Sequence, residues 1–455
     1  MVRFNENNEV IRDDEYRAIL VGLQRNEDIS YSMEELAGLA EAANVEVLGQ
    51  MIQSLERPNT ATLIGKGKVE ELAEMVKNME ADTVIFNDEL TGMQLRNIED
   101  AVGVRVIDRT ILILDIFADR ATSKEGKLQV ELAQLAYRMP RLTGFGKSLS
   151  RLGGGIGTRG PGEKKLETDR RHIERRMYEI KSELAQLKST RGVQRSRREK
   201  NEIPTVALVG YTNSGKSALM NQILSLSEKE DKTVFEKDML FATLDTQQRS
   251  VKLDSNHSFI LVDTVGFVSK LPHSLVEAFK ATLEEVVCAD LLVHVVDSAF
   301  ENYDFQIDVT DKVLAEIGAA GKEKIMAYNK IDIVEARLGE NCTGEDRLKN
   351  ADSSDAEPSN GAVSSVIVPR PGTDSVYISA KYGKNIDELL EKIKKCIFKD
   401  EVNAKLLVPY TKGDVSSYLC EKAKVDVMDY RENGTYFEVT LKESDYQRLK
   451  EYEIE

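Results

Sequence analysis

The segment 203–217, IPTVALVGYTNSGKS, constrains the fold more than any other part of the chain. It begins with a short apolar run and continues into the pattern GxxxxGKS, from Gly210 to Ser217. This combination predicts a buried strand, a glycine-rich loop and then a helix, here ALMNQIL. Backbone N–H groups of such a loop, with the N-terminus of the helix, surround phosphate groups. The sequence therefore predicts a phosphate-binding loop at the carboxyl edge of a mostly parallel sheet.

The end of this loop carries the side chains that a bound nucleotide needs. Backbone amides from Asn213 to Ser217 are expected to surround the β-phosphate. Lys216 would bridge the β- and γ-phosphates, and the Ser217 hydroxyl would bind Mg²⁺. The pattern does not distinguish ATP from GTP, so the choice of base depends on later segments.

A second apolar run, FILVDTVGF (259–267), ends in the pattern DxxG. Asp263 would hold Mg²⁺ through water, and the Gly266 amide would contact the γ-phosphate. The next residue is Phe267, where Ras-like proteins have a glutamine that orients the attacking water. Because a phenyl ring cannot orient water by hydrogen bonding, we expect slow hydrolysis by the protein alone and stimulation by a partner.

The run IMAYNKID (325–332) indicates guanine as the base. The Asp332 carboxylate can accept hydrogen bonds from N1–H and from the exocyclic amine of guanine. Adenine has no such pair of donors, so a bound ATP would leave this carboxylate unpaired. We expect Asn329 to join this segment to the phosphate-binding loop and the stem of Lys330 to pack on the base.

The run VYISAK (376–381) completes the expected base site. The Ala380 amide would reach guanine O6, and Lys381 would cover the other face of the base. Four motifs in this order, each after a predicted strand, predict a site for GTP and Mg²⁺. An ATP site is excluded chiefly by the NKID pattern.

Between the first two motifs, FATLDTQQR (241–249) has the character of a switch segment. Thr243 and Thr246 are the hydroxyls placed to become the second magnesium ligand, and we favour Thr243. Such a segment orders around the γ-phosphate and relaxes when it is lost.

The predicted site draws its residues from these five segments. Lys216, Thr243 and Gly266 are expected to act in catalysis, and Ser217, Thr243 and, through water, Asp263 to hold the metal. The residues expected to contact the nucleotide are Gly210, Tyr211, Thr212, Asn213, Ser214, Gly215, Lys216, Ser217, Phe241, Ala242, Thr243, Leu244, Asp245, Asp263, Thr264, Val265, Gly266, Asn329, Lys330, Ile331, Asp332, Ser379, Ala380 and Lys381.

Residues before the loop alternate between two patterns. Ser32 and Glu35 have the spacing of a capping box at a helix start. LIGKGK (63–68) lacks the spacing of a phosphate-binding loop. Alternation of this kind implies a mostly parallel sheet. The predicted strands are 17–23, 45–50, 82–87 and 104–108, and the predicted helices are 32–43, 68–79 and 91–102.

A helical hairpin is expected next. A long helix over 111–140 and a second over 166–187, with a near-heptad apolar spacing, would pack as antiparallel neighbours. The loop between them, 141–165, is rich in Gly and Arg. Glycine allows close approach to a sugar–phosphate backbone, and arginine binds phosphates and stacks on bases. The composition leaves two readings open, an RNA contact or a solvated flexible loop.

The charge distribution bears on this choice. The whole chain has a net charge of −16, yet residues 138–200 contain 18 Lys or Arg and 7 Asp or Glu. A basic segment in an acidic protein favours a localised contact with a polyanion. The acidic remainder would repel that polyanion and restrict docking to one orientation.

Composition excludes several other classes. The chain has no apolar run of about 18 residues, so no membrane span is predicted. The polar N-terminus lacks the apolar core of a secretion signal. The four cysteines and four histidines show no metal-ligand spacing, which fits a reducing cytoplasm. We expect a cytoplasmic monomer.

These patterns divide the 455 residues into an α/β multidomain chain. The expected parts are an N-terminal α/β domain (1–120), the hairpin with its loop and linker (121–200, linker 189–202), a Ras-like P-loop domain (201–398) and a small C-terminal α/β domain (400–455). A Gly/Ser/Asn/Asp/Pro-rich stretch, 338–375, is expected to be a disordered insertion. In the last domain, 436–441 is a predicted strand and 443–452 a predicted helix.

Long stretches, beyond the nucleotide motifs, resemble the HflX-type GTPases of the Obg-HflX group. They are TLIGKGKVEEL (62–72), EGKLQVELAQLAYRMPRL (125–142), SRLGGGIGTRGPGE (150–163), LETDRR (166–171), FATLD (241–245), DTVGFVSKLPHSLVEAFKATLEE (263–285) and LVPYTKGD (407–414). A hydrophobic residue after DxxG, here Phe267, is a further trait of that family.

The resemblance implies a GTPase with the same three-part build that associates with the large (50S) ribosomal subunit. It implies a role in translation, in splitting or rescuing stalled ribosomes under heat stress, or in ribosome biogenesis. Loop 141–165 would approach ribosomal RNA near the peptidyl-transferase centre, which favours the RNA reading of that loop.

Two local departures and one open alternative accompany this resemblance. Lys164 follows GPGE where the family has threonine, and Thr246 replaces a proline. Neither change removes a residue expected to hold nucleotide. An RNA-binding assembly scaffold, in which hydrolysis is incidental, stays the alternative to a GTPase timer, and Phe267 keeps it open.

Overall fold

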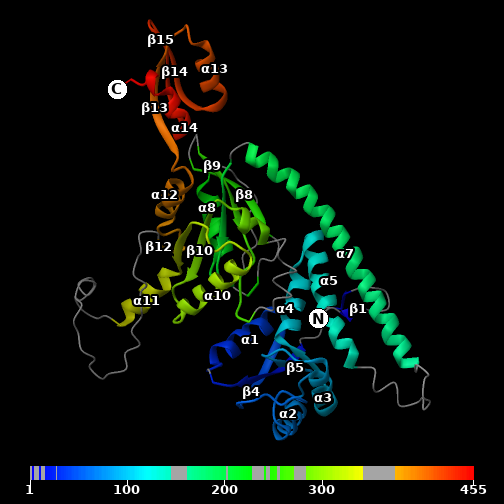
Figure 1. The fold of residues 1–455 in the computed structure, drawn as a ribbon. Coiled ribbons are helices and arrows are strands. Elements are labelled where there is room, and N and C mark those ends of the chain that lie inside the picture. Colours follow the sequence, from blue (N-terminus) through cyan, green and yellow to red (C-terminus); the bar gives the residue numbers. More distant parts are fainter. Residues whose placement is uncertain are drawn as a thin grey trace.

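The computed structural model describes residues 16–26, 28–144, 161–200, 203–227, 240–241, 246–253, 257–270, 283–341 and 375–454, with two short strands before them, β1 (Arg3–Phe4) and β2 (Val10–Ile11). These residues form three α/β units and a long helical hairpin (Figure 1). The predicted fold class, a multidomain α/β protein with a mostly parallel central sheet, is confirmed. The expected insertion 338–375 lies almost wholly outside the described residues.

The N-terminal unit is a four-stranded parallel sheet in the order β4-β3-β5-β6. Apolar side chains fill both faces of this sheet, as parallel strands covered by helices require. Its strands are β3 (Tyr16–Gln24), β4 (Val45–Ser54), β5 (Thr83–Phe86) and β6 (Arg105–Asp108), and its helices are α1 (Ser30–Ala42), α2 (Lys66–Met79), α3 (Gly92–Val102) and α4 (Arg109–Arg120).

The predicted capping box in this unit is wrong. Helix α1 begins at Ser30, so Ser32 and Glu35 lie inside it, and both side chains are buried. The Ser32 hydroxyl donates to Asn87 Oδ1 at 3.0 Å. The Glu35 carboxylate faces another unit of the protein and has no role in capping.

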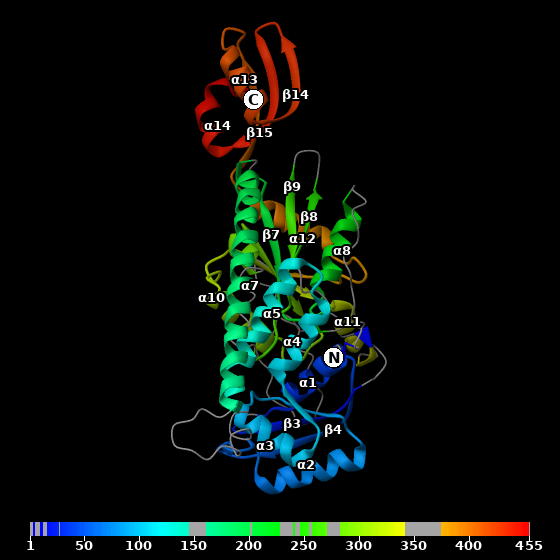
Figure 2. The same ribbon diagram turned by 90° about the vertical axis from the view of Figure 1, so that its right-hand side faces the viewer.

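The predicted helix over 111–140 is two helices, α4 and α5 (Lys124–Arg138), followed by the 3₁₀ turn η1 (Met139–Gly144). The break occurs because Ala121 is extended and the Ser123 hydroxyl accepts a hydrogen bond from Gly126 N at 2.9 Å, which starts α5. The second arm, α7 (Pro161–Lys200), continues through the expected linker. It lies beside the N-terminal and central units in both views (Figures 1 and 2).

The central unit is a six-stranded sheet in the order β12-β11-β10-β7-β9-β8, parallel except for β8 at its edge. Strands β7, β9, β11 and β12 end at the four predicted motifs, which meet at one edge of the sheet. The strands are β7 (Thr205–Val209), β8 (Gln247–Lys252), β9 (Ser258–Asp263), β10 (Leu291–Asp297), β11 (Lys324–Asn329) and β12 (Ser375–Tyr377), and the helices are α8 (Lys216–Leu226), α10 (Tyr303–Glu316), α11 (Ile331–Asn341) and α12 (Ile386–Ile397).

The C-terminal unit is a small antiparallel sheet in the order β13-β15-β14 with its own core around Leu406 and Phe437. It lies at the end of the molecule opposite the N-terminal unit (Figures 1 and 2). Its elements are β13 (Glu401–Val408), α13 (Gly413–Lys422), β14 (Lys424–Arg431), β15 (Gly434–Lys442), α14 (Glu443–Leu449) and η3 (Lys450–Tyr452).

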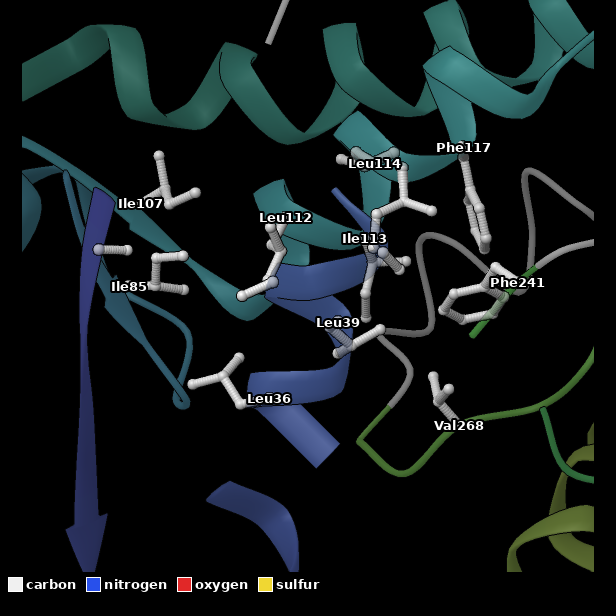
Figure 3. Close-up of a cluster of buried hydrophobic side chains, with 14 of the residues drawn as sticks. Leu36, Leu39, Ile85, Ile107, Leu112, Ile113, Leu114, Phe117, Phe241 and Val268 are labelled. Carbon is white, nitrogen blue, oxygen red and sulfur yellow. The ribbon is translucent and has the colours of Figure 1, made fainter. Parts of the chain in front are cut away.

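One hydrophobic cluster joins the N-terminal and central units. It contains Leu36 and Ile113 from the N-terminal unit, and Phe241 and Val268 from the central unit (Figure 3). Val265 of the central unit belongs to the same cluster. The predicted switch segment and the DxxG segment therefore each contribute a side chain to the core of another unit. Among the described helices, none is both long and apolar enough to cross a bilayer.

Candidate functional site

The loop after β7 is shaped by two glycines. Gly210 has φ +145°, and a Cβ there would lie 2.2 Å from the carbonyl oxygen of Val295. Gly215 has φ +93°, and a Cβ there would lie 2.2 Å from Asn329 Nδ2. Any side chain at these positions would clash with neighbouring strands, so the loop can pass this close to β10 and β11 only with glycine. Helix α8 then begins at Lys216, with its N-terminus toward the loop.

Lys216 is buried at the base of the loop, with 6% of its surface exposed. Its ammonium donates to the carbonyl oxygens of Gly210 at 3.1 Å and Tyr211 at 2.7 Å. An ammonium group has three donors, so one is left for a phosphate. Burial lowers the pKa of Lys216 to about 8, and the charge of Asp263 acts against that shift.

Ser217 and Asp263 are brought together from α8 and β9. The Ser217 hydroxyl donates to Asp263 Oδ2 at 2.7 Å, and the Asp263 side chain is completely buried. A hydroxyl and a carboxylate are oxygen ligands of the kind that a hard divalent cation such as Mg²⁺ takes. The described residues include no cluster of three or more His, Cys, Asp or Glu side chains that could hold a metal alone.

The DxxG segment is held against the loop through the backbone. Phe267 N donates to Gly210 O at 3.2 Å, and Thr212 N donates to Phe267 O at 2.7 Å. Gly266 is so close that a Cβ there would lie 3.0 Å from Lys216 Nζ. Gly266 therefore lies beside Lys216, the group expected to meet the γ-phosphate.

Asn329, at the end of β11, joins three motifs. Its Nδ2 donates to Ser214 O at 2.9 Å, and its Oδ1 accepts from Ala380 N at 2.9 Å. The phosphate-binding loop, NKID and SAK are thus connected by one buried amide. Ala380 N–H is already engaged here, so a contact with guanine O6 would require this donor to be shared or released.

The remaining base-site residues lie next to Asn329. Asp332 Oδ1 accepts a hydrogen bond from the Ser379 hydroxyl at 2.7 Å. Lys330 has φ +63°, and its ammonium pairs with Asp297 Oδ2 at 2.8 Å. The ion pair holds the Lys330 side chain in place, and the Ser379 hydroxyl holds that of Asp332. The surface expected to receive the base is therefore formed before a nucleotide binds.

Models of known families match three consecutive parts of the chain. They are described as GTP-binding GTPase N-terminal (residues 30–118), GTP-binding GTPase Middle Region (120–198) and 50S ribosome-binding GTPase (205–330). GTPase HflX of Caldanaerobacter subterraneus subsp. tengcongensis is 49% identical over 94% of this chain and 91% of that protein. The chain belongs to the HflX family of GTPases. It therefore binds and hydrolyses GTP.

GTPase HflX of Escherichia coli K12 is 44% identical over 70% of this chain and 74% of that protein. Among solved structures, a GTP-binding protein from the archaeon Sulfolobus solfataricus in complex with GDP is similar. It is 26% identical, with a TM-score of 0.41, and the match covers 84% of this chain and 99% of that one.

In this HflX-family chain the Phe267 ring turns away from the nucleotide side of the loop. It is 2% exposed and lies in a core cluster with Val209, Val262 and Leu283. The ring is a packing residue, so it supplies no polar group to an attacking water.

The predicted switch segment is described only at its ends. Phe241 N donates to Thr212 Oγ1 at 2.8 Å, which fixes the start of the segment to the phosphate-binding loop. Thr246 precedes β8. Ala242, Thr243, Leu244 and Asp245 lie outside the described residues.

Two charged residues beside the loop were not predicted from the sequence. Glu35 of α1 bonds to the hydroxyl of Tyr211, and Arg109 of α4 bonds to Ser269, two residues after Phe267. A signal existed: Glu35 lies on the apolar face of α1, where Met33 and Leu36 are buried. A charge on such a face is expected to have a buried partner.

Proposed function

We propose that this GTPase is a Mg²⁺-dependent timer on the large ribosomal subunit. GTP would favour a ribosome-bound state, and hydrolysis would release it during translation, ribosome rescue or biogenesis. The observation that carries the nucleotide part is the convergence of four motifs: Asn329 joins three of them, and backbone hydrogen bonds of Phe267 hold the fourth, DxxG, against the loop. The ribosomal part is supported by the match to a 50S ribosome-binding GTPase over residues 205–330.

Mg²⁺ would be bound by the Ser217 hydroxyl, with Asp263 holding a water of its shell. The 2.7 Å contact between these two groups supports this role, because one cation could satisfy both oxygens. When bound, the ion would neutralise charge on the β- and γ-phosphates. Thr243 remains the proposed second ligand.

Turnover would depend on the partner. The Phe267 ring is buried in the core, so the attacking water must be oriented by another group. Slow hydrolysis by the purified protein, with acceleration by the large subunit, is the expected result. A fast single-turnover rate that large subunits leave unchanged would refute partner dependence.

The RNA contact is proposed for loop 141–165 rather than for α7. In the described part of α7, Arg170 pairs with Glu174, Arg171 with Glu167, and Arg176 with Glu131 of α5. Arginines already bonded to carboxylates are poorer phosphate ligands, because an RNA phosphate must compete for them. Residues 167–188 hold 6 Lys or Arg against 5 Asp or Glu, so the positive excess of residues 138–200 lies mostly in loop 141–165 and in residues 189–200.

Sedimentation with separated ribosomal subunits tests the proposal. The protein should pellet with the large subunit in the presence of a non-hydrolysable GTP analogue, and less with GDP or without nucleotide. A Lys216→Ala variant should lose this nucleotide dependence. Equal pelleting under all conditions would favour the scaffold alternative, and no pelleting would refute the ribosomal role.

The proposal includes a monomer in the cytoplasm. The match to a 50S ribosome-binding GTPase over residues 205–330 supports the cytoplasmic location. Light scattering after size-exclusion chromatography should give a mass close to 51.0 kDa, and a doubled mass would contradict it.

A further inference from the structure

A buried polar cluster lies where the N-terminal unit meets the phosphate-binding loop. Glu35 of α1 and Arg109 at the start of α4 form an ion pair, and 3% and 2% of their side chains are exposed. Both are thus removed from water inside an interface between two units. Burying a charged pair is expensive unless further hydrogen bonds satisfy it. The residues that form these further hydrogen bonds therefore show which part of the protein the pair holds in place.

Two of these partners, Tyr211 and Ser269, belong to the nucleotide-binding unit. The Glu35 carboxylate accepts hydrogen bonds from the hydroxyls of Tyr211 and Ser269. Arg109 Nη2 donates to Ser269 O at 3.2 Å and to its hydroxyl at 3.1 Å. Its other terminal nitrogen donates to Asn87 Oδ1 at 3.1 Å. The cluster therefore joins three segments of the N-terminal unit to the phosphate-binding loop and to the segment after DxxG.

Tyr211 is the link from this cluster to the phosphate site. Its hydroxyl donates to Glu35 and accepts from Ser269 N at 2.7 Å. Its carbonyl oxygen accepts from Lys216 Nζ at 2.7 Å. One residue of the loop thus connects the N-terminal unit to the lysine and to the segment after DxxG.

A second contact acts in the same place. The rings of Phe117 in α4 and Phe241 in the switch segment meet edge to face, with centroids 4.6 Å apart (Figure 3). Phe241 N in turn donates to Thr212 of the loop. The same helix, α4, therefore provides Arg109 toward the DxxG side and Phe117 toward the switch side.

We propose that Glu35 and Arg109 are positioning residues that, through Tyr211 and Ser269, couple the nucleotide state of the loop to the docking of the N-terminal unit. Gly266 stands three residues before the Ser269 anchor and lies against Thr212 and Lys216 of the loop, so docking through Ser269 would fix the Gly266 amide where a γ-phosphate is expected. GDP lacks that phosphate. Docking of the N-terminal unit should therefore favour GTP over GDP, and GTP should favour docking by the same factor.

The test compares Tyr211→Phe with Tyr377→Phe. The first removes the linking hydroxyl and retains the ring, the loop backbone and the Glu35–Arg109 pair. The second removes the hydroxyl of another tyrosine of the nucleotide-binding unit. Among the described residues, that hydroxyl has no hydrogen-bond partner. Dissociation constants for GDP and for a non-hydrolysable GTP analogue would be measured for the full-length protein.

The Tyr211→Phe variant should weaken binding of the GTP analogue by about fivefold or more relative to GDP. Tyr377→Phe should leave the ratio unchanged. A merely structural role of the cluster would weaken both ligands equally or affect only thermal stability. Either of those results, or an unchanged ratio, would overturn the proposal.

Two further measurements address the coupling itself. The double variant Glu35→Gln/Tyr211→Phe should change the ratio of the two dissociation constants little more than the stronger of the single variants does. The reason is that both substitutions disrupt the same Tyr211–Glu35 hydrogen bond. Hydrogen exchange of residues 30–42 should be slower with the GTP analogue than with GDP, and Tyr211→Phe should abolish that difference. Additive effects, or exchange that ignores the nucleotide, would contradict the coupling. These tests use nucleotides alone, so their failure is distinguishable from failure of ribosome binding.

Discussion

At the scale of single residues, buried polar side chains organise the site. Asn329 is 2% exposed and bonds to two loops that are far apart in sequence. Lys216 is buried against two carbonyl oxygens. Each group is satisfied on the protein side and retains capacity toward the ligand, which is the arrangement expected of a preorganised site.

Base selection should depend on Asp332. In an Asp332→Asn variant the amide would present a donor to guanine's exocyclic amine, leaving two donors opposed. We expect GTP affinity to fall by about tenfold or more. Affinity for xanthosine triphosphate should rise, since xanthine has a carbonyl there. Competition binding with the two nucleotides measures the change, and an unaltered preference for GTP would contradict the role of Asp332.

Nucleotide affinity should also depend on pH through Lys216. The pKa of this lysine is lowered to about 8 by burial, so the charged form, which binds phosphate, is lost as pH rises through 8. GTP affinity should therefore fall by about tenfold between pH 7 and pH 9. A Lys216→Arg variant, whose guanidinium stays charged, provides the control. If its profile falls as steeply as that of the parent protein, Lys216 is not the titrating group.

At the scale of elements, strand ends determine which residues meet. The first and last of the motif-bearing strands, β7 (Thr205–Val209) and β12 (Ser375–Tyr377), are far apart in the sequence, yet parallel pairing through β9, β10 and β11 brings the carboxyl ends of all these strands to one edge. This arrangement also limits which side chains can reach the nucleotide. Phe267, the residue after DxxG, has its ring in the hydrophobic core and so cannot contribute a group to the reaction.

Substituting Phe267 illustrates that limit. A Phe267→Gln variant restores the residue type that orients water in Ras-like proteins, but the side chain would enter an apolar cluster. We expect no faster hydrolysis and a loss of about 3 kcal/mol in the free energy of unfolding. Phe267→Leu should cost only about 1 kcal/mol. Denaturant unfolding and single-turnover assays give both quantities, and faster hydrolysis in the glutamine variant would show that the position can reach the water.

At the scale of the whole molecule, the units lie in a row, with the nucleotide-binding unit between the other two (Figures 1 and 2). Helix α7 is held to α5 by Arg176 and Glu131, and to the nucleotide-binding unit by Lys188 and Glu284. The base of loop 141–165 is also anchored, because Arg141 bonds to Leu90 O at 2.9 Å. The loop thus starts from a fixed point on the N-terminal unit.

A pair of arginines within that loop should matter for the ribosome and not for GTP. An Arg151→Ala/Arg159→Ala variant should bind large subunits with a salt dependence reduced by up to about 1.4, since each RNA phosphate contact contributes about 0.7 to the slope. Its GDP affinity should be unchanged. Arg170→Ala, which removes an arginine already paired with Glu174, is the matched control. Equal behaviour of the two variants in subunit binding would argue against the loop as the RNA contact.

The nucleotide motifs could be predicted from the sequence because each is a contiguous pattern whose task depends on local geometry. Gly210, Lys216 and Asp263 follow directly from strands that an apolar run predicts. The alternation of strands and helices likewise indicated the parallel sheets. The helix break before Ser123 was missed, because a single capping hydroxyl interrupts an otherwise continuous helical pattern.

Only the tertiary structure decided what Glu35 and Arg109 do. In the sequence, Glu35 has the spacing of a capping residue, and nothing near it names a partner 176 residues away. Contacts between units form when folded helices and strands pack against one another. Which residues then meet depends on the shape of both surfaces and cannot be read from a local sequence pattern. The sequence by itself determined a guanine nucleotide site. Only the packing of α1 and α4 against that site brought the phosphate-binding loop into contact with the N-terminal unit.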